Sequence, residues 1–149
     1  MAMKAIGRFK MKNKTNTVSP SGFEPYIRGE KKNLVIVENE HFIAIVDEKP
    51  ISPGHCVVFP RRVEDAFLDL SDAEISGIMI FAKSVGKALK KAVTCDKIGI
   101  AVIGIQTRHA HVHLVPINGP DDLNFTRARG SPPLDELNEL ADQVRSKLI

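Results

Sequence analysis

Apolar runs in the first part of the chain predict three β-strands. Residues 34–37 read LVIV and residues 41–47 read HFIAIVD, with the polar residues 38–40 between them. Short runs rich in β-branched and aromatic residues on either side of a polar turn are typical of a β-hairpin. Two prolines and a glycine within residues 48–55 then interrupt pairing, and the apolar pattern resumes at residues 56–60, CVVFP. We therefore predict a hairpin followed by a third strand.

The hydrophobic period changes after this strand and predicts a long helix. Residues 71–74, SDAE, have the S-x-x-E form of a capping box, in which the serine and glutamate side chains satisfy free N–H groups where a helix begins. Apolar residues then recur with helical spacing, at positions 75, 78, 79, 82, 85, 89 and 92. This stripe predicts one amphipathic helix that packs against the sheet.

The last third of the chain predicts two further strands and a terminal helix. Residues 98–105, IGIAVIGI, and residues 109–117, HAHVHLVPI, are the strand candidates. From residue 131 onwards, a Pro-Pro pair and two early acidic residues precede apolar residues at helical spacing up to Leu148. About five strands, one long helix and a terminal helix indicate an α+β fold.

Composition favours a soluble protein with a single domain. The chain has 149 residues, of which 43% are hydrophobic and 26% charged, so it can bury one continuous core. It has no run of about 18 apolar residues, and we expect no membrane-spanning segment. Two cysteines, Cys56 and Cys95, are too few for a disulfide framework and favour a reducing, cytoplasmic location.

The net charge of +3 does not indicate binding to nucleic acid, because the excess is confined to the N-terminus. Five of the 21 basic residues precede the first acidic residue, Glu24; without those five, 16 basic residues face 18 acidic ones, a net charge of −2. We predict that residues 1–20 form a basic, disordered tail and that residues 21–149 form the domain. The tail lacks the apolar segment of a secretory signal, so secretion is not expected.

Three of the five histidines, His109, His111 and His113, occupy every second position of one short segment. In a strand they would share one face, and the apolar residues between them would point to the core. Such a row can be a solvated face, can bind a metal ion with a ligand from elsewhere, or can attack phosphorus. A neutral imidazole is a good nucleophile when its other nitrogen donates to a carbonyl, and flanking imidazoles disfavour a charge on the middle ring. We favour the nucleophile hypothesis.

This segment resembles the signature of the histidine triad (HIT) family, which is His-x-His-x-His followed by apolar residues and often proline. Residues 37–62, with an aspartate before a proline-rich turn and then Pro-Gly-His, resemble the family's nucleotide-binding half. The resemblance spans about residues 27–118. It implies a five-stranded antiparallel sheet with one long helix and a C-terminal helix, and a homodimer. The implied reaction is hydrolysis or transfer at the α-phosphate of a purine nucleoside phosphoramidate or dinucleoside polyphosphate, through a covalent nucleotidyl-histidine intermediate.

The resemblance also implies roles for single residues. His111 corresponds to the nucleophile, His109 and His113 to residues that orient it and stabilise the phosphate, and His55 to an additional active-site histidine. Asp47 corresponds to the ribose ligand, since a carboxylate can accept hydrogen bonds from two adjacent hydroxyls.

The remaining expected contacts concern the base and the phosphate. Ile45 and Val57 would line the base pocket, although periodicity alone makes them ordinary core residues. Gln106 and Thr107 would contact the phosphate, together with backbone amides. Gln106 stands where the family often has a serine, and no asparagine occurs between residues 98 and 108, where one branch of the family often has one.

Two departures keep other functions open. Many members of that branch carry a Cys-x-x-Cys near the start, whereas residues 21–27 read SGFEPYI, so we expect no structural zinc and no cofactor. The missing asparagine and serine allow a second hypothesis, a catalytically weak nucleotide-binding regulatory module. A third is a zinc-binding interaction protein that uses His55 together with the triad.

Overall fold

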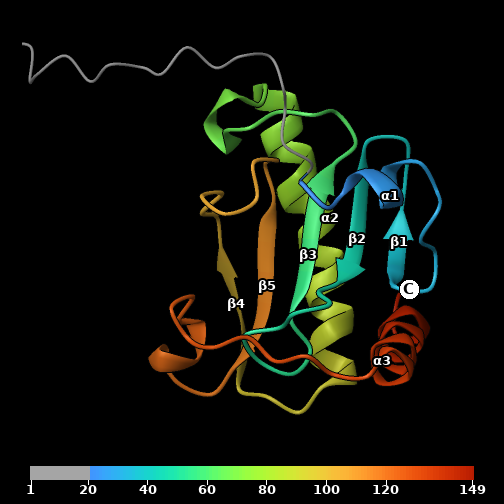
Figure 1. Ribbon diagram of the computed structural model, residues 1–149, viewed down its shortest axis with the longest axis vertical. Helices are drawn as coiled ribbons and strands as arrows, with labels where there is room; N and C mark the ends of the chain where they lie inside the picture. The colour runs from blue at the N-terminus through green and yellow to red at the C-terminus, as the bar shows by residue number, and fades with distance from the viewer. Residues whose placement is uncertain (1–20) are drawn as a thin grey trace, which may run out of the picture.

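The computed structural model describes residues 21–149 of the chain (Figure 1). The predicted basic tail, residues 1–20, lies outside the described residues. The elements follow one another in the order α1 (Glu24–Ile27), β1 (Val35–Glu38), β2 (Phe42–Val46), β3 (Cys56–Pro60), η1 (Phe67–Asp69), α2 (Asp72–Ala92), β4 (Lys97–Ala101), β5 (Val112–Ile117), η2 (Pro120–Leu123) and α3 (Leu134–Ser146).

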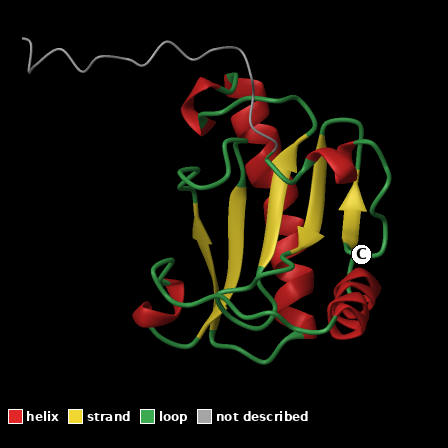
Figure 2. Cartoon of the chain, viewed as in Figure 1, coloured by secondary structure: helices red, strands yellow, loops and turns green. Residues whose placement is uncertain are grey.

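The five strands form one antiparallel sheet in the order β1-β2-β3-β5-β4 (Figure 2). The predicted α+β fold, with its five-stranded antiparallel sheet, long helix and C-terminal helix, is confirmed. Helix α2 connects β3 to the edge strand β4, and β5 then returns between these two strands. The strand that carries the end of the histidine motif is therefore an inner strand, with β3 on one side and β4 on the other.

Helix α2 begins at the predicted capping box. Ser71 is the N-cap; its side chain accepts a hydrogen bond from the N–H of Glu74, and the Glu74 carboxylate accepts one from the N–H of Ser71, both at 3.1 Å. The apolar stripe packs on the back of the sheet as Figure 1 is drawn, and its buried residues are Ile78, Ala82, Val85, Ala88 and Leu89. Helix α3 packs beside α2 and against β1. None of the helices within residues 21–149 is both long and apolar enough to cross a membrane.

The observed β4 and β5 are shorter than the predicted strands 98–105 and 109–117, and these boundaries were wrong. Strand β4 ends at Ala101, and the chain then turns through Gly104, whose φ of 75° lies in the left-handed region that favours glycine. Strand β5 begins only at Val112. The residues just before it are drawn away from the sheet, because the N–H of Ala110 donates to the carbonyl of Glu64 at 2.7 Å.

Candidate active site

Strand register gathers the predicted site residues on the face of the sheet opposite α2. Ile45 of β2 pairs with Val57 of β3, and Val57 pairs with His113 of β5, so these three side chains form a row across the sheet. Asp47 lies two residues after Ile45, and His55 lies two residues before Val57. Because side chains two residues apart share a face, both join the same face. A bond from the N–H of Asp47 to the carbonyl of His55, at 2.9 Å, continues the pairing past the strand ends.

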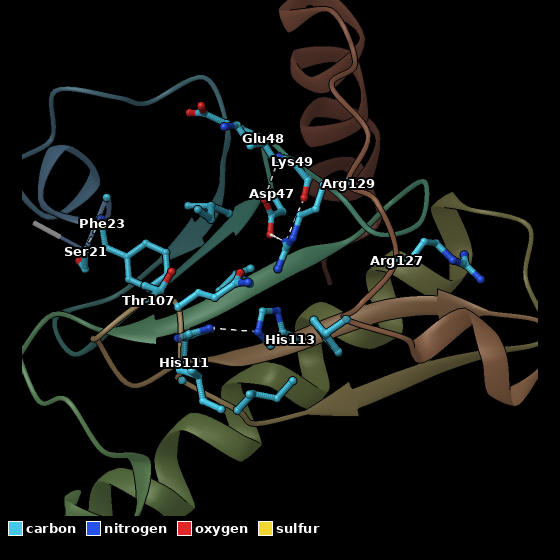
Figure 3. Close-up of a pocket in the computed structure, with 18 of the residues that line it drawn as sticks. Ser21, Phe23, Asp47, Glu48, Lys49, Thr107, His111, His113, Arg127 and Arg129 are labelled. Atoms are coloured by element: carbon cyan, nitrogen blue, oxygen red, sulfur yellow. Dashed lines mark hydrogen bonds and ion pairs between the residues drawn. The ribbon is translucent and has the colours of Figure 1, made fainter.

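A cavity of about 880 Å³ opens on this face (Figure 3). The sheet contributes Ile45, Val57 and His113, and Asp47 and His111 come from residues that flank β2 and β5. The walls come from three segments that lie far apart in the sequence: residues 21–23, residues 103–107 and residues 125–129. Seven of the nine predicted site residues line the cavity, Gln106 and Thr107 among them. His55 and His109 do not line it, and both are fully buried.

Three imidazoles form a continuous chain of hydrogen bonds below the cavity. Nε2 of His55 lies 2.9 Å from Nδ1 of His113, and Nε2 of His113 lies 3.0 Å from Nε2 of His111. Nδ1 of His111 lies 2.6 Å from the carbonyl oxygen of His109. At the other end, the N–H of Ile51 donates to Nδ1 of His55 at 3.2 Å. Both ends of the chain are thus bonded to main-chain groups whose donor or acceptor role is fixed.

The two ends specify the same tautomers. A carbonyl can only accept, so His111 carries its proton on Nδ1 and presents a lone pair at Nε2; His113 must then donate from Nε2 and accept at Nδ1. An amide N–H can only donate, so His55 accepts at Nδ1 and donates from Nε2 to His113. The arrangement leaves His111 Nε2 as an unprotonated nitrogen whose lone pair accepts the His113 N–H, so it can attack once that hydrogen bond opens.

Burial keeps these imidazoles neutral. It lowers the pKa of His55 to about 3, with further lowering by the charges of Arg129 and His111. It lowers the pKa of His113 to about 2, where His111, His55 and Arg129 add to the effect. The pKa of His111 is also lowered, mainly by burial, and the bond to the His109 carbonyl opposes the shift. At neutral pH the site therefore contains three neutral rings.

His109 does not continue the row that the sequence predicts. Its Nε2 donates to the carbonyl of Pro60 at 2.7 Å, and its ring is enclosed by Phe23 and Phe59, which stack on each other with their centroids 4.1 Å apart. Nδ1 of His109 is buried and has no hydrogen-bond partner among the described residues. The expectation that all three histidines share one face of a strand is wrong for His109, which precedes β5, while the ring centroids of His111 and His113 lie 4.6 Å apart. The side chain of His109 thus serves packing, and its carbonyl orients His111.

Asp47 lies at the cavity edge and is only 19% exposed. Its Oδ1 accepts the N–H of Lys49 at 2.9 Å, while Oδ2 lies 3.4 Å from the guanidinium of Arg129 and 3.6 Å from Nε2 of His55. Burial raises the pKa of Asp47, and the Lys49 N–H and the Arg129 charge oppose the shift. The carboxylate can accept hydrogen bonds from a ligand in the cavity once Oδ2 is released by Arg129.

Sequence reasoning missed the segment after β5 that closes the cavity. The ring of Phe125 packs against His113 with a centroid distance of 4.6 Å and against His55 at 6.0 Å. Arg127 and Arg129 follow on the same segment, which Figure 1 shows crossing in front of the lower ends of β5 and β3 on its way to α3. The signal available was an aromatic residue followed by two arginines, a short distance after the motif. Residues 21–23 were missed in the same way.

Among residues 21–149, the side chains that come closest to a metal-ligand set are Asp47, His55 and His113, whose ligand atoms lie within 4.8 Å of one another. A zinc ion would need a lone pair on Nε2 of His55. The N–H of Ile51 instead occupies Nδ1 and places the ring proton on Nε2. This hydrogen-bonded arrangement favours a proton over a metal ion at that position.

Comparisons with known proteins agree with this fold. The HIT domain family matches residues 28–119. The chain is 27% identical over 139 residues to the bifunctional bis(5'-adenosyl)-triphosphatase/adenylylsulfatase FHIT of Arabidopsis thaliana, covering 90% of this chain and 73% of that protein. It is 27% identical over 114 residues to an AP-4-A phosphorylase of Mycobacterium tuberculosis, covering 72% and 58%.

The fold is also similar to solved structures. A hypothetical histidine triad nucleotide-binding protein of Sulfolobus tokodaii superposes with a TM-score of 0.72 at 26% identity, over 85% of this chain and 90% of that one. The family match covers well over half of the chain and includes every residue of the hydrogen-bonded imidazole chain. The chain is therefore a member of the histidine triad family.

Proposed function

We propose that the protein transfers the nucleoside monophosphate group of a purine nucleoside phosphoramidate or dinucleoside polyphosphate first to His111 and then to water. The observation that carries the proposal is the lone pair on His111 Nε2, which the hydrogen bonds of the imidazole chain require. The two named relatives support an adenylyl donor, because their names describe enzymes that act on bis(5'-adenosyl) triphosphate, adenylyl sulfate and AP-4-A.

The proposed first step forms one bond and breaks another. The lone pair of His111 Nε2 bonds to the α-phosphorus, and the bond from phosphorus to the leaving group breaks, with its electron pair going to the leaving group. In this step the Nε2–H of His113 leaves His111 and donates a hydrogen bond to a phosphoryl oxygen, while the leaving group takes its proton from solvent. Water then attacks the phosphorus and loses a proton to solvent, and the bond from phosphorus to His111 Nε2 breaks, which restores the lone pair of His111.

The other cavity residues would hold the nucleotide during these steps. Asp47 would accept hydrogen bonds from the ribose hydroxyls, and Ile45 and Val57, which form one row with His113, would contact the base. Gln106 and Thr107 would approach the phosphate from the loop before the motif. His55 fixes the tautomer of His113, while His109 acts through its carbonyl.

The test is a rapid quench with a substrate that has a good leaving group. Wild-type protein should trap one nucleoside monophosphate per chain on the peptide with residues 109–113, and His111→Ala should abolish both adduct and turnover. Because a phosphorus–nitrogen bond to imidazole is labile in acid, an alkaline quench runs in parallel. His113→Ala should slow the reaction without removing the adduct.

Two outcomes would favour the other hypotheses. If His111→Ala keeps turnover within about tenfold, or about 1.4 kcal/mol of barrier, covalent catalysis at this residue is wrong. Tight nucleotide binding with negligible turnover would indicate the regulatory module. Stoichiometric zinc after preparation in metal-free buffer would indicate the zinc-binding interaction protein.

We further propose that the protein works as a homodimer in the cytoplasm. Strand β4 is an edge strand, and apolar side chains near it are exposed: Ile100 by 48%, Val102 by 41% and Ile103 by 46%. An exposed apolar edge is a ready surface for strand pairing with a second copy. Light scattering should report twice the 16.4 kDa of one chain, and a fully active monomer would contradict the proposal.

The cytoplasmic location is supported by Cys56 and Cys95, which are both free thiols.

A further inference from the structure

The neutral imidazoles leave the proposed reaction in need of a positive charge. A phosphoryl group carries negative charge on its non-bridging oxygens, and this charge must be stabilised as the new bond forms. Neither His55 nor His113 holds a second proton near neutral pH, since burial lowers the pKa of both. A permanent cation beside His111 would supply this charge.

Arg129 lies where such a cation is required. Its Nη1 donates to the carbonyl of Lys49 at 3.0 Å and contacts Oδ2 of Asp47 at 3.4 Å, which places the guanidinium at the cavity wall. Its positive charge also acts on His55, His111 and His113. In Figure 3 the Arg129 side chain reaches from the upper wall towards the His111–His113 pair.

The guanidinium has unused hydrogen-bonding capacity. Arginine carries five N–H donors, and among residues 21–149 only Nη1 of Arg129 has a hydrogen-bond partner. The side chain is 29% exposed, so the remaining donors are accessible from the cavity. A planar fork of donors suits the oxygens of a phosphoryl group.

The contact between Arg129 and Asp47 is suited to exchange. Charge-assisted hydrogen bonds in proteins are typically about 2.7–2.9 Å long, and this one is longer at 3.4 Å. Ribose hydroxyls that bond to Oδ2 of Asp47 would replace the guanidinium at that atom. Binding of the sugar would then release Arg129 towards the phosphate.

We propose that Arg129 is the phosphate-binding cation of this site and contacts the non-bridging oxygens of the α-phosphoryl group while it is transferred to His111. This rests on the proposed function of the cavity. Arg129 gives up and takes up no proton; it supplies charge and hydrogen bonds.

The neighbouring Arg127 is placed differently and provides a comparison. Its Nη2 donates to the carbonyl of Asp121 at 2.9 Å and lies 3.5 Å from the Asp122 carboxylate. Figure 3 shows its side chain extending away from His111 and His113. These contacts hold the segment that carries Arg127 against residues 121 and 122. We therefore expect the loss of Arg127 to weaken phosphate binding less than the loss of Arg129.

The test compares a ligand that has a phosphate with one that lacks it. Calorimetric titrations with AMP and with adenosine are run on wild type, Arg129→Met, Arg129→Lys and the control Arg28→Met, which removes an exposed arginine paired only with Glu30. Arg129→Met should weaken AMP binding by about tenfold or more, the scale of a lost charged hydrogen bond, and change adenosine binding by less than about twofold. Arg129→Lys should recover part of the loss, and Arg28→Met should change neither ligand.

A second set of variants separates direct contact from neutralisation of Asp47. If Arg129 only screens the Asp47 charge, Asp47→Asn should abolish the effect of Arg129→Met on AMP binding. Direct contact predicts that the effect persists in the Asp47→Asn background. Loss of that effect, equal losses for AMP and adenosine, or unchanged AMP affinity in Arg129→Met would overturn the proposal.

Failure of the proposed function gives a different pattern. A wild type that binds AMP through Arg129 but never forms the His111 adduct would refute covalent catalysis and retain the phosphate-binding role of Arg129. A wild type that binds neither AMP nor adenosine would refute both. Thermal unfolding of each variant verifies that a lost affinity is not a lost fold.

Discussion

The main-chain N–H of Ile51 donates to Nδ1 of His55 over 3.2 Å, and this one contact sets the protonation of ring nitrogens as far away as His111. Because His55 must then donate from Nε2, His113 accepts at Nδ1 and donates from its own Nε2. The tautomer of the proposed nucleophile is thus specified by the turn between β2 and β3 as well as by the carbonyl of His109.

A first prediction concerns His55, which touches no ligand in this arrangement and acts through His113. His55→Ala removes the donor to His113 Nδ1, so the ring of His113 is free to adopt the wrong tautomer, and we expect kcat to fall by about 10- to 100-fold with little change in KM. His55→Gln can keep a donor towards His113 and should restore part of the rate. Equal activity of the alanine variant and the wild type would contradict the tautomer argument.

A second prediction concerns stability and pH. The pKa values of His55 and His113 are lowered by folding to about 3 and about 2, whereas unfolded histidine titrates near 6.5. Between these pH values the unfolded chain binds more protons than the folded one. The contribution of the two neutral rings to the free energy of unfolding is therefore fully present above about pH 6.5 and is lost as the pH falls towards the folded pKa values. The melting temperature should therefore fall between pH 7 and pH 5.

The His55→Gln variant is the control for this measurement. It removes one of the buried titrating rings, so its melting temperature should depend less on pH across the same window. An identical pH dependence in both proteins would show that other groups cause the loss. For the same reason, the acidic limb of the kcat/KM profile should lie below the ordinary histidine value of about 6.5, since burial also lowers the pKa of His111.

The elements that the sequence predicted well are those with a local cause. The capping box at Ser71 and the apolar stripe with a period of 3.6 residues are enough to define α2. In the strands, side chains two residues apart share a face, which places Asp47 with Ile45. The same rule places His55 with Val57. Knowledge of the pairing between β2 and β3 is then enough to bring Asp47 and His55 together.

The parts that could not be predicted depend on contacts between distant segments. His109 leaves the histidine row because its ring bonds to the carbonyl of Pro60, the last residue of β3, which lies 49 residues away in sequence. Arg129 reaches Asp47 across 82 residues, and no periodicity relates the two. Side chains that enclose a site from loops in this way become visible only when the strand order is known.

A third prediction tests the glycine beside His55. Gly54 has a φ of 91°, and a Cβ built there would lie 2.9 Å from Cγ of Pro116 and 3.1 Å from Cγ2 of Val93. Backbone strain and overpacking together should cost Gly54→Ala about 2–4 kcal/mol of unfolding free energy in urea titrations. Gly119→Ala is the matched control, because its φ of −166° is extended and no atom lies within 4 Å of the added Cβ. A Gly54→Ala variant as stable as the control would refute the steric argument.

A final prediction concerns Asp47, whose Oδ1 is held by the Lys49 N–H while Oδ2 faces Arg129 and His55. If Oδ2 accepts hydrogen bonds from the ribose, Asp47→Ala should weaken binding of AMP by about 1.5–3 kcal/mol, the scale of a hydrogen bond to a charged group. The wild type should lose a similar amount when AMP is replaced by its 2′,3′-dideoxy analogue, and the variant should bind the two ligands alike, because the partner of the hydroxyls is gone. If the substitution instead weakens AMP and the dideoxy analogue equally, the carboxylate acts on the phosphate end of the site through Arg129, and the ribose assignment is wrong.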